Sequence, residues 1–165
     1  MIKTAILTIS DKGYSKERED LTGPSIAKIL PEDSYTVEYF KIIPDEKDII
    51  IKELKHLCDD VKINLILTNG GTGFSKRDIT PEATLEVVEK LTPGFNEVMR
   101  AESLKITPHA MLSRAVSGIR KSSIIINLPG SPKGAVENLQ AILSAIPHGV
   151  KILTGEASEC AKLRE

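Results

Sequence analysis

The chain has 165 residues, the size of one domain, and 41% of them are hydrophobic, as in ordinary soluble globular proteins. Its 22 Lys and Arg residues nearly balance 23 Asp and Glu residues, which excludes a bulk electrostatic attraction to nucleic acid or an acidic membrane. No apolar run approaches the roughly 18 residues of a membrane span, and the N-terminus shows no signal-type cleavage site. We therefore expect a single cytoplasmic domain, residues 1–165, without nucleic-acid or membrane partners.

The first half of the chain alternates apolar strands with helices. Three runs rich in β-branched and other apolar residues predict strands: 4–10, 35–43 and 65–68. A helix is expected from Thr22 to Pro31, with Pro24 near its first position. A longer helix is expected over 46–61, where apolar residues recur at helical spacing. The segment between Asp11 and Asp20 is polar and is expected to be a loop.

Prolines divide the second half into shorter helices. Helix starts are predicted at four steps: Thr80-Pro81, Thr92-Pro93, Thr107-Pro108 and Ser131-Pro132. Thr80 and Ser131 are the expected N-caps, since a proline follows each at the first helical position. A buried strand covers 124–127, and the last helix is expected to end near Pro147. Buried strands that alternate with helices predict an α/β fold, a three-layer αβα sandwich with a mostly parallel central sheet.

Two glycine-containing loops share one design. Gly70-Gly71-Thr72-Gly73 and Pro129-Gly130-Ser131-Pro132 each follow a buried strand and lead into a helix. Loops at the carboxyl ends of parallel strands meet at one edge of the sheet, where free N–H groups can bind an anion. One such loop can equally be a tight turn that needs glycine. Two on the same edge predict a phosphate-binding cleft.

Two aspartates accompany these loops. Asp78 precedes a helix, but Thr80 is better placed as its cap, so the Asp78 carboxylate is available for a ligand. The alternative is a loop acid paired with Lys76 or Arg77. Asp45 follows the second strand and is either the cap of the 46–61 helix or a second acid at the same edge. Two carboxylates there could hold a Mg²⁺ ion that bridges nucleotide phosphates.

The remaining polar residues give weaker signals. Candidate phosphate partners are the basic residues Lys76, Arg77, Arg114 and Lys133. The Walker A and dinucleotide fingerprints do not fit the glycine loop. The histidines and cysteines show no spacing typical of a metal site or a catalytic triad, and we expect Cys58 to be a core residue rather than a disulfide partner of Cys160.

The stretch from Thr68 to Thr84, TNGGTGFSKRDITPEAT, resembles the signature of molybdenum cofactor biosynthesis proteins of the Mog/MoaB type, the molybdopterin adenylyltransferases. Further similarities are spread over about residues 8 to 133: Thr8-Ile9-Ser10-Asp11, Ile43-Pro44-Asp45-Glu46, Pro93-Gly94-Phe95, Leu112-Ser113-Arg114 and Asn127 to Lys133.

The resemblance implies a homotrimer that transfers AMP from Mg-ATP to the terminal phosphate of molybdopterin and releases pyrophosphate. It implies Asp45 and Asp78 as the catalytic and Mg²⁺-binding acids. It also implies nucleotide- or pterin-binding roles for the matched loop residues: Ser10, Asp11, Gly70, Gly71, Thr72, Gly73, Pro129, Gly130, Ser131 and Lys133. The metal-insertion enzyme of the pathway is an expected partner. The alternatives are a non-catalytic pterin- or nucleotide-binding protein of the same fold and, more distantly, a nucleotide pyrophosphatase or competence-type relative.

Overall fold

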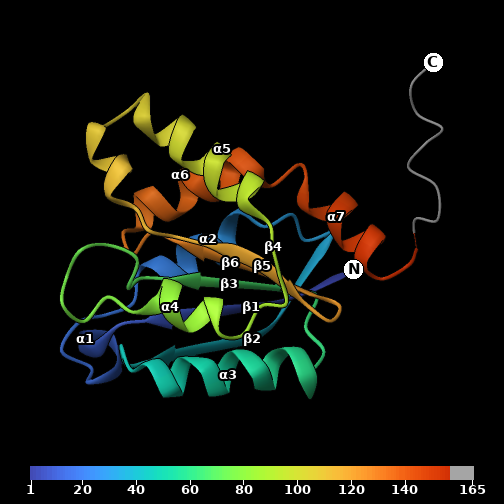
Figure 1. The fold of residues 1–165 in the computed structure, drawn as a ribbon, viewed down its shortest axis with the longest axis horizontal. Helices are drawn as coiled ribbons and strands as arrows, with labels where there is room; N and C mark the ends of the chain where they lie inside the picture. Colours follow the sequence, from blue (N-terminus) through green and yellow to red (C-terminus); the bar gives the residue numbers. More distant parts are fainter. Residues whose placement is uncertain (157–165) are drawn as a thin grey trace.

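The protein is built around a six-stranded sheet with the strand order β2-β1-β3-β6-β5-β4 (Figure 1), seen here in a computed structural model that describes residues 1–156. Strands β1, β2, β3 and β6 are parallel to one another. Strand β5 pairs antiparallel with β6 on one side and with the edge strand β4 on the other. The strands are β1 (Ile2–Ile9), β2 (Tyr35–Ile43), β3 (Leu65–Asn69), β4 (Lys90–Leu91), β5 (Ser117–Arg120) and β6 (Ser123–Leu128). The predicted mostly parallel sheet is confirmed.

Helices cover both faces of the sheet, which gives three layers. They are α1 (Asp11–Tyr14), α2 (Thr22–Ile29), α3 (Lys47–Asp59), α4 (Thr80–Leu85), α5 (Pro93–Leu104), the 3₁₀ helix η1 (Pro108–Leu112), α6 (Pro132–Ile142) and α7 (Ile146–Leu153). Helices α2, α5, α6 and α7 lie on one face, and α3 and α4 lie on the other.

Alternate residues of each central strand serve the two layers. In β3, Leu65 and Leu67 pack into the core under α2, α5, α6 and α7, while Ile66 packs into the core over α3 and α4. All three side chains are fully buried. Strands buried on both faces produce continuous apolar runs in the sequence, which is why their positions were predictable. Cys58 is 1% exposed in the α3 core, so the prediction of a core residue is confirmed. Cys160 lies outside the described residues.

Three local predictions differ from the structure. The polar segment after β1 contains the short helix α1, capped by Ser10, whose Oγ accepts a hydrogen bond from the Gly13 N–H at 3.1 Å. The last predicted helix is in fact two, because α6 ends at Ile142 and Pro147 lies in the first turn of α7, where a missing N–H costs nothing. The strands β4 and β5, which pair antiparallel at one end of the sheet, were not predicted.

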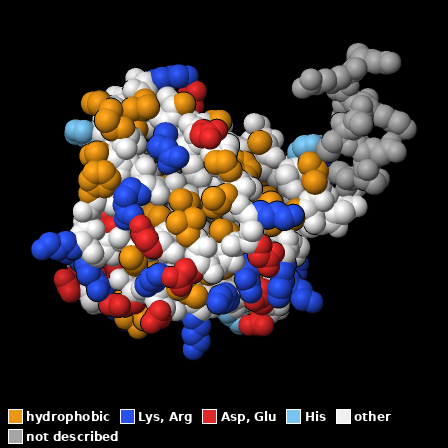
Figure 2. Space-filling view, viewed as in Figure 1, with side chains coloured by type: hydrophobic (Ala, Val, Ile, Leu, Met, Phe, Trp, Pro, Cys, Tyr) orange, Lys and Arg blue, Asp and Glu red, His pale blue; other side chains and the backbone are white. Residues whose placement is uncertain are grey.

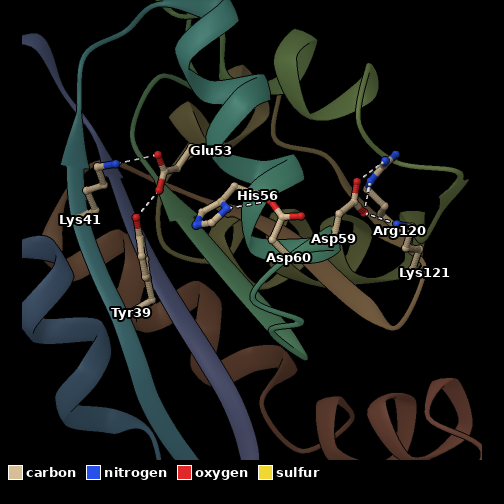
Figure 3. A network of polar contacts seen from close by, with 8 residues as sticks. All are labelled: Tyr39, Lys41, Glu53, His56, Asp59, Asp60, Arg120 and Lys121. Carbon is tan, nitrogen blue, oxygen red and sulfur yellow. Dashed lines mark hydrogen bonds and ion pairs between the residues drawn. The ribbon is translucent and has the colours of Figure 1, made fainter.

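Polar contacts fasten α3 to its surroundings (Figure 3). Glu53, only 8% exposed, accepts hydrogen bonds from the Tyr39 hydroxyl and from Lys41 Nζ, so it ties the helix to β2. At the C-terminal end of α3, the Asp59 carboxylate accepts hydrogen bonds from Nε and Nη2 of Arg120 at 3.0 and 2.7 Å.

The outer surface of the molecule is charged. Figure 2 shows charges of both signs interspersed along the lower side of the view, where α3 lies in Figure 1. Across residues 1–156, every helix is too short or too polar to span a bilayer.

Candidate active site

A cleft of about 510 Å³ opens at the carboxyl ends of β1 and β3. The chain leaves β1 toward β2 on one side, whereas β3 lies on the other side of β1, so the connections diverge at this point. Such a switch point is where open α/β sheets bind ligands. The walls include Ser10 after β1, Asn69 and Gly70 at the end of β3, and Gly130 after β6.

The two predicted glycine loops lie against each other. Gly70 has a φ of +93° and Gly71 has a φ of +66°, a region that side-chain-bearing residues rarely adopt. A Cβ on Gly70 would overlap the carbonyl oxygen of Ile9, and a Cβ on Gly130 would stand 3.2 Å from the Gly70 Cα. The Gly70 N–H donates to the Leu128 carbonyl at 3.2 Å. Glycine is therefore required here by close backbone approach as well as by dihedral angle.

Asp11 and Asp45, which follow β1 and β2 respectively, are joined by two hydrogen bonds. The Asp11 N–H donates to Asp45 Oδ2 at 2.8 Å, and the Asp45 N–H donates to Asp11 Oδ1 at 3.0 Å. Asp45 does not cap α3, whose N-cap is Glu46 without a side-chain cap bond. The alternative of a simple capping aspartate is therefore wrong, and the carboxylate of Asp45 lines the cleft instead.

Arg77 acts on Asp11 rather than on the cleft. Its Nε and Nη2 donate to the two carboxylate oxygens of Asp11 at 2.9 and 3.0 Å, and Nη2 also reaches Glu46 Oε1 at 2.7 Å. Hydrogen bonds from Arg77 lower the pKa of Asp11 against the opposing effect of burial. Asp11 thus stays ionised and holds Asp45 by a backbone and a side-chain contact.

The environment of Asp45 has the opposite effect. Burial raises the pKa of Asp45, and the negative charges of Asp11 and Asp78 raise it further, against the lowering effects of the Asp11 backbone N–H and the Arg77 charge. A carboxyl group whose pKa is perturbed in a cleft is a candidate functional residue. Asp45 and Asp78 both line this cleft.

Asp78 is fixed by its own loop. Its Oδ2 accepts the Ser75 N–H at 3.1 Å, and its Oδ1 has no hydrogen-bond partner among the described residues. The predicted N-cap role of Thr80 is wrong, because α4 begins at Thr80 itself and its hydroxyl donates to the Gly70 carbonyl at 2.8 Å. Asp78 forms no ion pair with Lys76 or Arg77 within residues 1–156, so that alternative is also wrong.

Some of the other predicted site residues line the cleft, and the rest do not. Ser10 and Ser131 line the cleft, and Ser131 also caps α6 as predicted by accepting the Gly134 N–H at 3.2 Å. Lys133 does not line the cleft; its Nζ lies 3.8 Å from Glu137 Oε1, and 80% of its side chain is exposed. Four further predicted residues support or flank the cleft without lining it: Asp11, Thr72, Gly73 and Pro129.

The third wall was missed by the sequence reasoning. It consists of the segment before α2 together with the first residue of that helix, and it contributes Arg18, Glu19, Asp20 and Thr22 to the cleft. Asp20 Oδ1 accepts the N–H groups of Thr22 and Gly23 at 3.0 and 3.1 Å, as an N-terminal capping group does. An aspartate two residues before a Thr-Gly-Pro helix start was the available signal. Arg18 is the only basic residue among those that line the cleft.

Comparisons with known proteins agree with this architecture. The MoCF_biosynth family, described as "Probable molybdopterin binding domain", matches residues 5–148. The chain belongs to this family. The resemblance to molybdenum cofactor biosynthesis proteins predicted from the sequence is thereby confirmed.

Proteins with known names or structures align along most of the chain. The molybdopterin adenylyltransferase of Helicobacter pylori (strain ATCC 700392 / 26695) is 46% identical over 158 residues, covering 93% of this chain and 89% of that protein. The molybdopterin adenylyltransferase of Escherichia coli (strain K12) is 37% identical over 175 residues, covering 97% and 89%. The crystal structure of the molybdopterin biosynthesis enzyme MoaB from Thermus thermophilus superposes with a TM-score of 0.90 at 45% identity, covering 96% of this chain and all of that one.

Proposed function

We propose that this protein is a molybdopterin adenylyltransferase, which transfers the adenylyl group of ATP to the terminal phosphate of molybdopterin and releases pyrophosphate. The observation that carries the proposal is the pair Asp45 and Asp78 in one cleft between two glycine loops. Family membership and 46% identity to an enzyme of that name support it. In this proposal the whole chain is one nucleotide- and molybdopterin-binding domain.

The chemistry requires no protein nucleophile. A phosphate oxygen of the pterin attacks the α-phosphorus of ATP, a new P–O bond forms, and the bond to the pyrophosphate oxygen breaks. Catalysis of such an in-line displacement depends on positioning and on stabilisation of phosphate charge. The volume of about 510 Å³ is in the usual range of small-molecule sites.

Backbone groups of the two loops are the natural phosphate ligands in this proposal. Gly70 and Gly71 present a glycine backbone to the cleft, and Gly130 and Ser131 lie at the N-terminus of the 11-residue helix α6. A helix N-terminus and glycine-loop amides both favour anions. Arg18 is the cation placed to contact a phosphate. Ser10 contributes a hydroxyl, and Asp11 acts by holding Asp45.

The acids fit a Mg²⁺ ion that arrives with the nucleotide. Residues 1–156 contain no cluster of three or more metal-binding side chains, but Mg²⁺ is usually held by one or two carboxylates together with substrate phosphates. Asp45 Oδ1 and Asp78 Oδ1 have no hydrogen-bond partner among the described residues, so each acid has an oxygen to offer. When bound, the ion would offset charge on the phosphates. Asp45 and Asp78 would hold such an ion in the cleft and so help to place the nucleotide phosphates.

The resemblance also leads us to propose a homotrimer in the cytoplasm that delivers its product to the metal-insertion enzyme of the same pathway. Exposed apolar side chains support a role for protein contacts. One apolar groove of about 380 Å³ lies between α5 and α6 and includes Phe95, Val98 and Ile142. Sedimentation analysis of the purified protein tests the assembly, and a monomer at all concentrations would refute it.

The activity is tested by pyrophosphate release from ATP, Mg²⁺ and molybdopterin. We expect turnover by the wild type, and a loss on the order of a hundredfold or more in kcat for Asp78→Asn. Asp60→Asn is the matched control, because Asp60 is exposed and lies outside the cleft, and its ion pair among residues 1–156 is with His56 on α3. Binding of ATP and molybdopterin without pyrophosphate release would instead indicate the non-catalytic alternative.

A further inference from the structure

Arg114 makes an unusual set of contacts with the loop that carries Asp78. Its Nε donates to the Gly73 carbonyl at 2.7 Å, and its Nη2 donates to the Asp78 carbonyl at 3.0 Å. Its Nη1 donates to Glu82 at the start of α4. The backbone N–H of Arg114 adds a bond to the Thr72 carbonyl at 2.9 Å. One residue therefore holds both ends of the segment 72–78.

These contacts anchor the main chain of that segment, and the side chain of Arg77 adds a second anchor through Asp11 and Glu46. Within residues 1–156, no residue outside 70–80 other than Arg114 forms a hydrogen bond with the main chain of 72–78. The bonds between Ser75 and Asp78 close a turn inside the loop but do not place it relative to the cleft. Residues 74–77 are exposed, so packing contributes little. Of the two arginines, Arg114 is the one that bonds the main chain of Asp78 itself, so the position of the Asp78 carboxylate depends most directly on Arg114.

The chemistry of arginine suits this task. A guanidinium presents N–H donors in several fixed directions in one plane, whereas a lysine ammonium is a single point of charge on a flexible stem. Arg114 uses three of its nitrogens on three different groups. It does not line the cleft, so a direct contact with substrate phosphate, the role considered from the sequence, does not describe it.

We propose that Arg114 is a positioning residue, which fixes the 72–78 loop and thereby places Asp78 for catalysis. This inference rests on the proposed function for the part that concerns turnover. The conformational part stands independently, because it concerns hydrogen bonds within the protein. Glu82 assists by pairing with the guanidinium from α4.

The test compares Arg114→Lys with Arg100→Lys. Arg100 lies on α5 and donates to the carbonyls of Ser113 and Ala115, the neighbours of Arg114, at 3.5 and 3.1 Å. It makes no bond to the 72–78 loop, so it is matched in residue type and location. We expect a fall in kcat on the order of tenfold to a hundredfold for Arg114→Lys, with a smaller change in the KM for ATP. Arg100→Lys keeps the wild-type kcat.

Hydrogen exchange provides a readout that does not need activity. The amides of Ser75 and Asp78 should exchange faster in Arg114→Lys than in wild type or Arg100→Lys, because the turn they close loses its anchor. Wild-type kcat or unchanged exchange in Arg114→Lys overturns the inference. If the wild type shows no adenylyl transfer but Arg114→Lys still exchanges faster, the proposed function is refuted, whereas the role of Arg114 in fixing the 72–78 loop stands.

Misfolding of Arg114→Lys is controlled by a second variant. Glu82→Gln removes the charge that holds the guanidinium but leaves its carbonyl bonds available, so we expect a weaker effect in the same direction on exchange and kcat. Urea unfolding of all three variants identifies global loss of structure. If Glu82→Gln folds and behaves as wild type in both measurements while Arg114→Lys is unfolded, the inference is overturned.

Discussion

Substitution of Gly70 by alanine tests the closeness of the two glycine loops. The residue has a φ of +93°, and an added Cβ would overlap the carbonyl oxygen of Ile9. A left-handed backbone costs an alanine about 1–2 kcal/mol, and overpacking typically adds about 1–3 kcal/mol. Ile9 is 2% exposed in β1 and cannot move without disturbing the sheet. We therefore expect Gly70→Ala to lose about 2–5 kcal/mol of unfolding free energy.

The matched control is Gly94→Ala. Gly94 lies in α5, and an added Cβ meets nothing within 4 Å, so alanine should be neutral or stabilise by up to about 1 kcal/mol. Urea unfolding measures both variants, and Gly70→Ala should also lower the Tm by on the order of 10 °C. A Gly70→Ala protein within about 0.5 kcal/mol of wild type would refute the argument from backbone approach. Its turnover should fall as well, because Gly130 packs on the same Cα.

Two further predictions concern titratable groups. Asp45→Asn should stabilise the folded protein at pH 7 by on the order of 0.5–1 kcal/mol while it abolishes turnover, because the raised pKa of Asp45 means that its ionised form is disfavoured in the fold. This gain in stability should vanish as the pH falls toward 3.8, where Asp45 is protonated in the unfolded chain as well. Urea unfolding of the variant and the wild type at pH 7 and at this lower pH measures the difference. A variant less stable than wild type at pH 7 contradicts the prediction. Cys58 should resist thiol reagents at pH 8 in a Cys160→Ser background, because burial raises the pKa of its thiol to about 11. One thiol should react after unfolding in urea, and rapid reaction of the folded protein would show that the α3 core opens.

The sequence predicted the features that are locally encoded. The strands β1, β3 and β6 are buried on both faces, so each produces an apolar run. Ser131 caps α6 by a contact within the first turn of the helix, in which its side chain accepts the Gly134 N–H. The antiparallel strands β4 and β5 lack such a signature, because β4 has only two residues, both exposed, and β5 is SGIR. They become strands only by pairing with neighbours at the sheet edge.

The sequence placed the two acids and the two glycine loops at one edge of the sheet, where they line one cleft, but it did not predict the contacts that connect them. Asp45 and Asp11 are 34 residues apart, and their mutual bonds depend on the relative placement of two strand ends. Thr80 was expected to cap α4, but its hydroxyl instead donates to the Gly70 carbonyl, which the tight turn at Gly70 and Gly71 brings within reach. The partners of Arg77 and Arg114 are equally set by tertiary structure. A basic residue near a glycine loop therefore does not reveal from sequence whether it serves a ligand or the protein.

The distribution of charge around the cleft explains why a dication suits this site. The lining carries the acids Glu19, Asp20, Asp45 and Asp78 but only one cation, Arg18. The two arginines nearest the glycine loop are engaged by protein groups. A bare triphosphate would meet these carboxylates without enough compensating charge, and like charges disfavour one another at close range. Under the proposed function, we therefore expect neutralising charge to arrive with the nucleotide, and we expect the acids that disfavour free ATP to favour its magnesium complex.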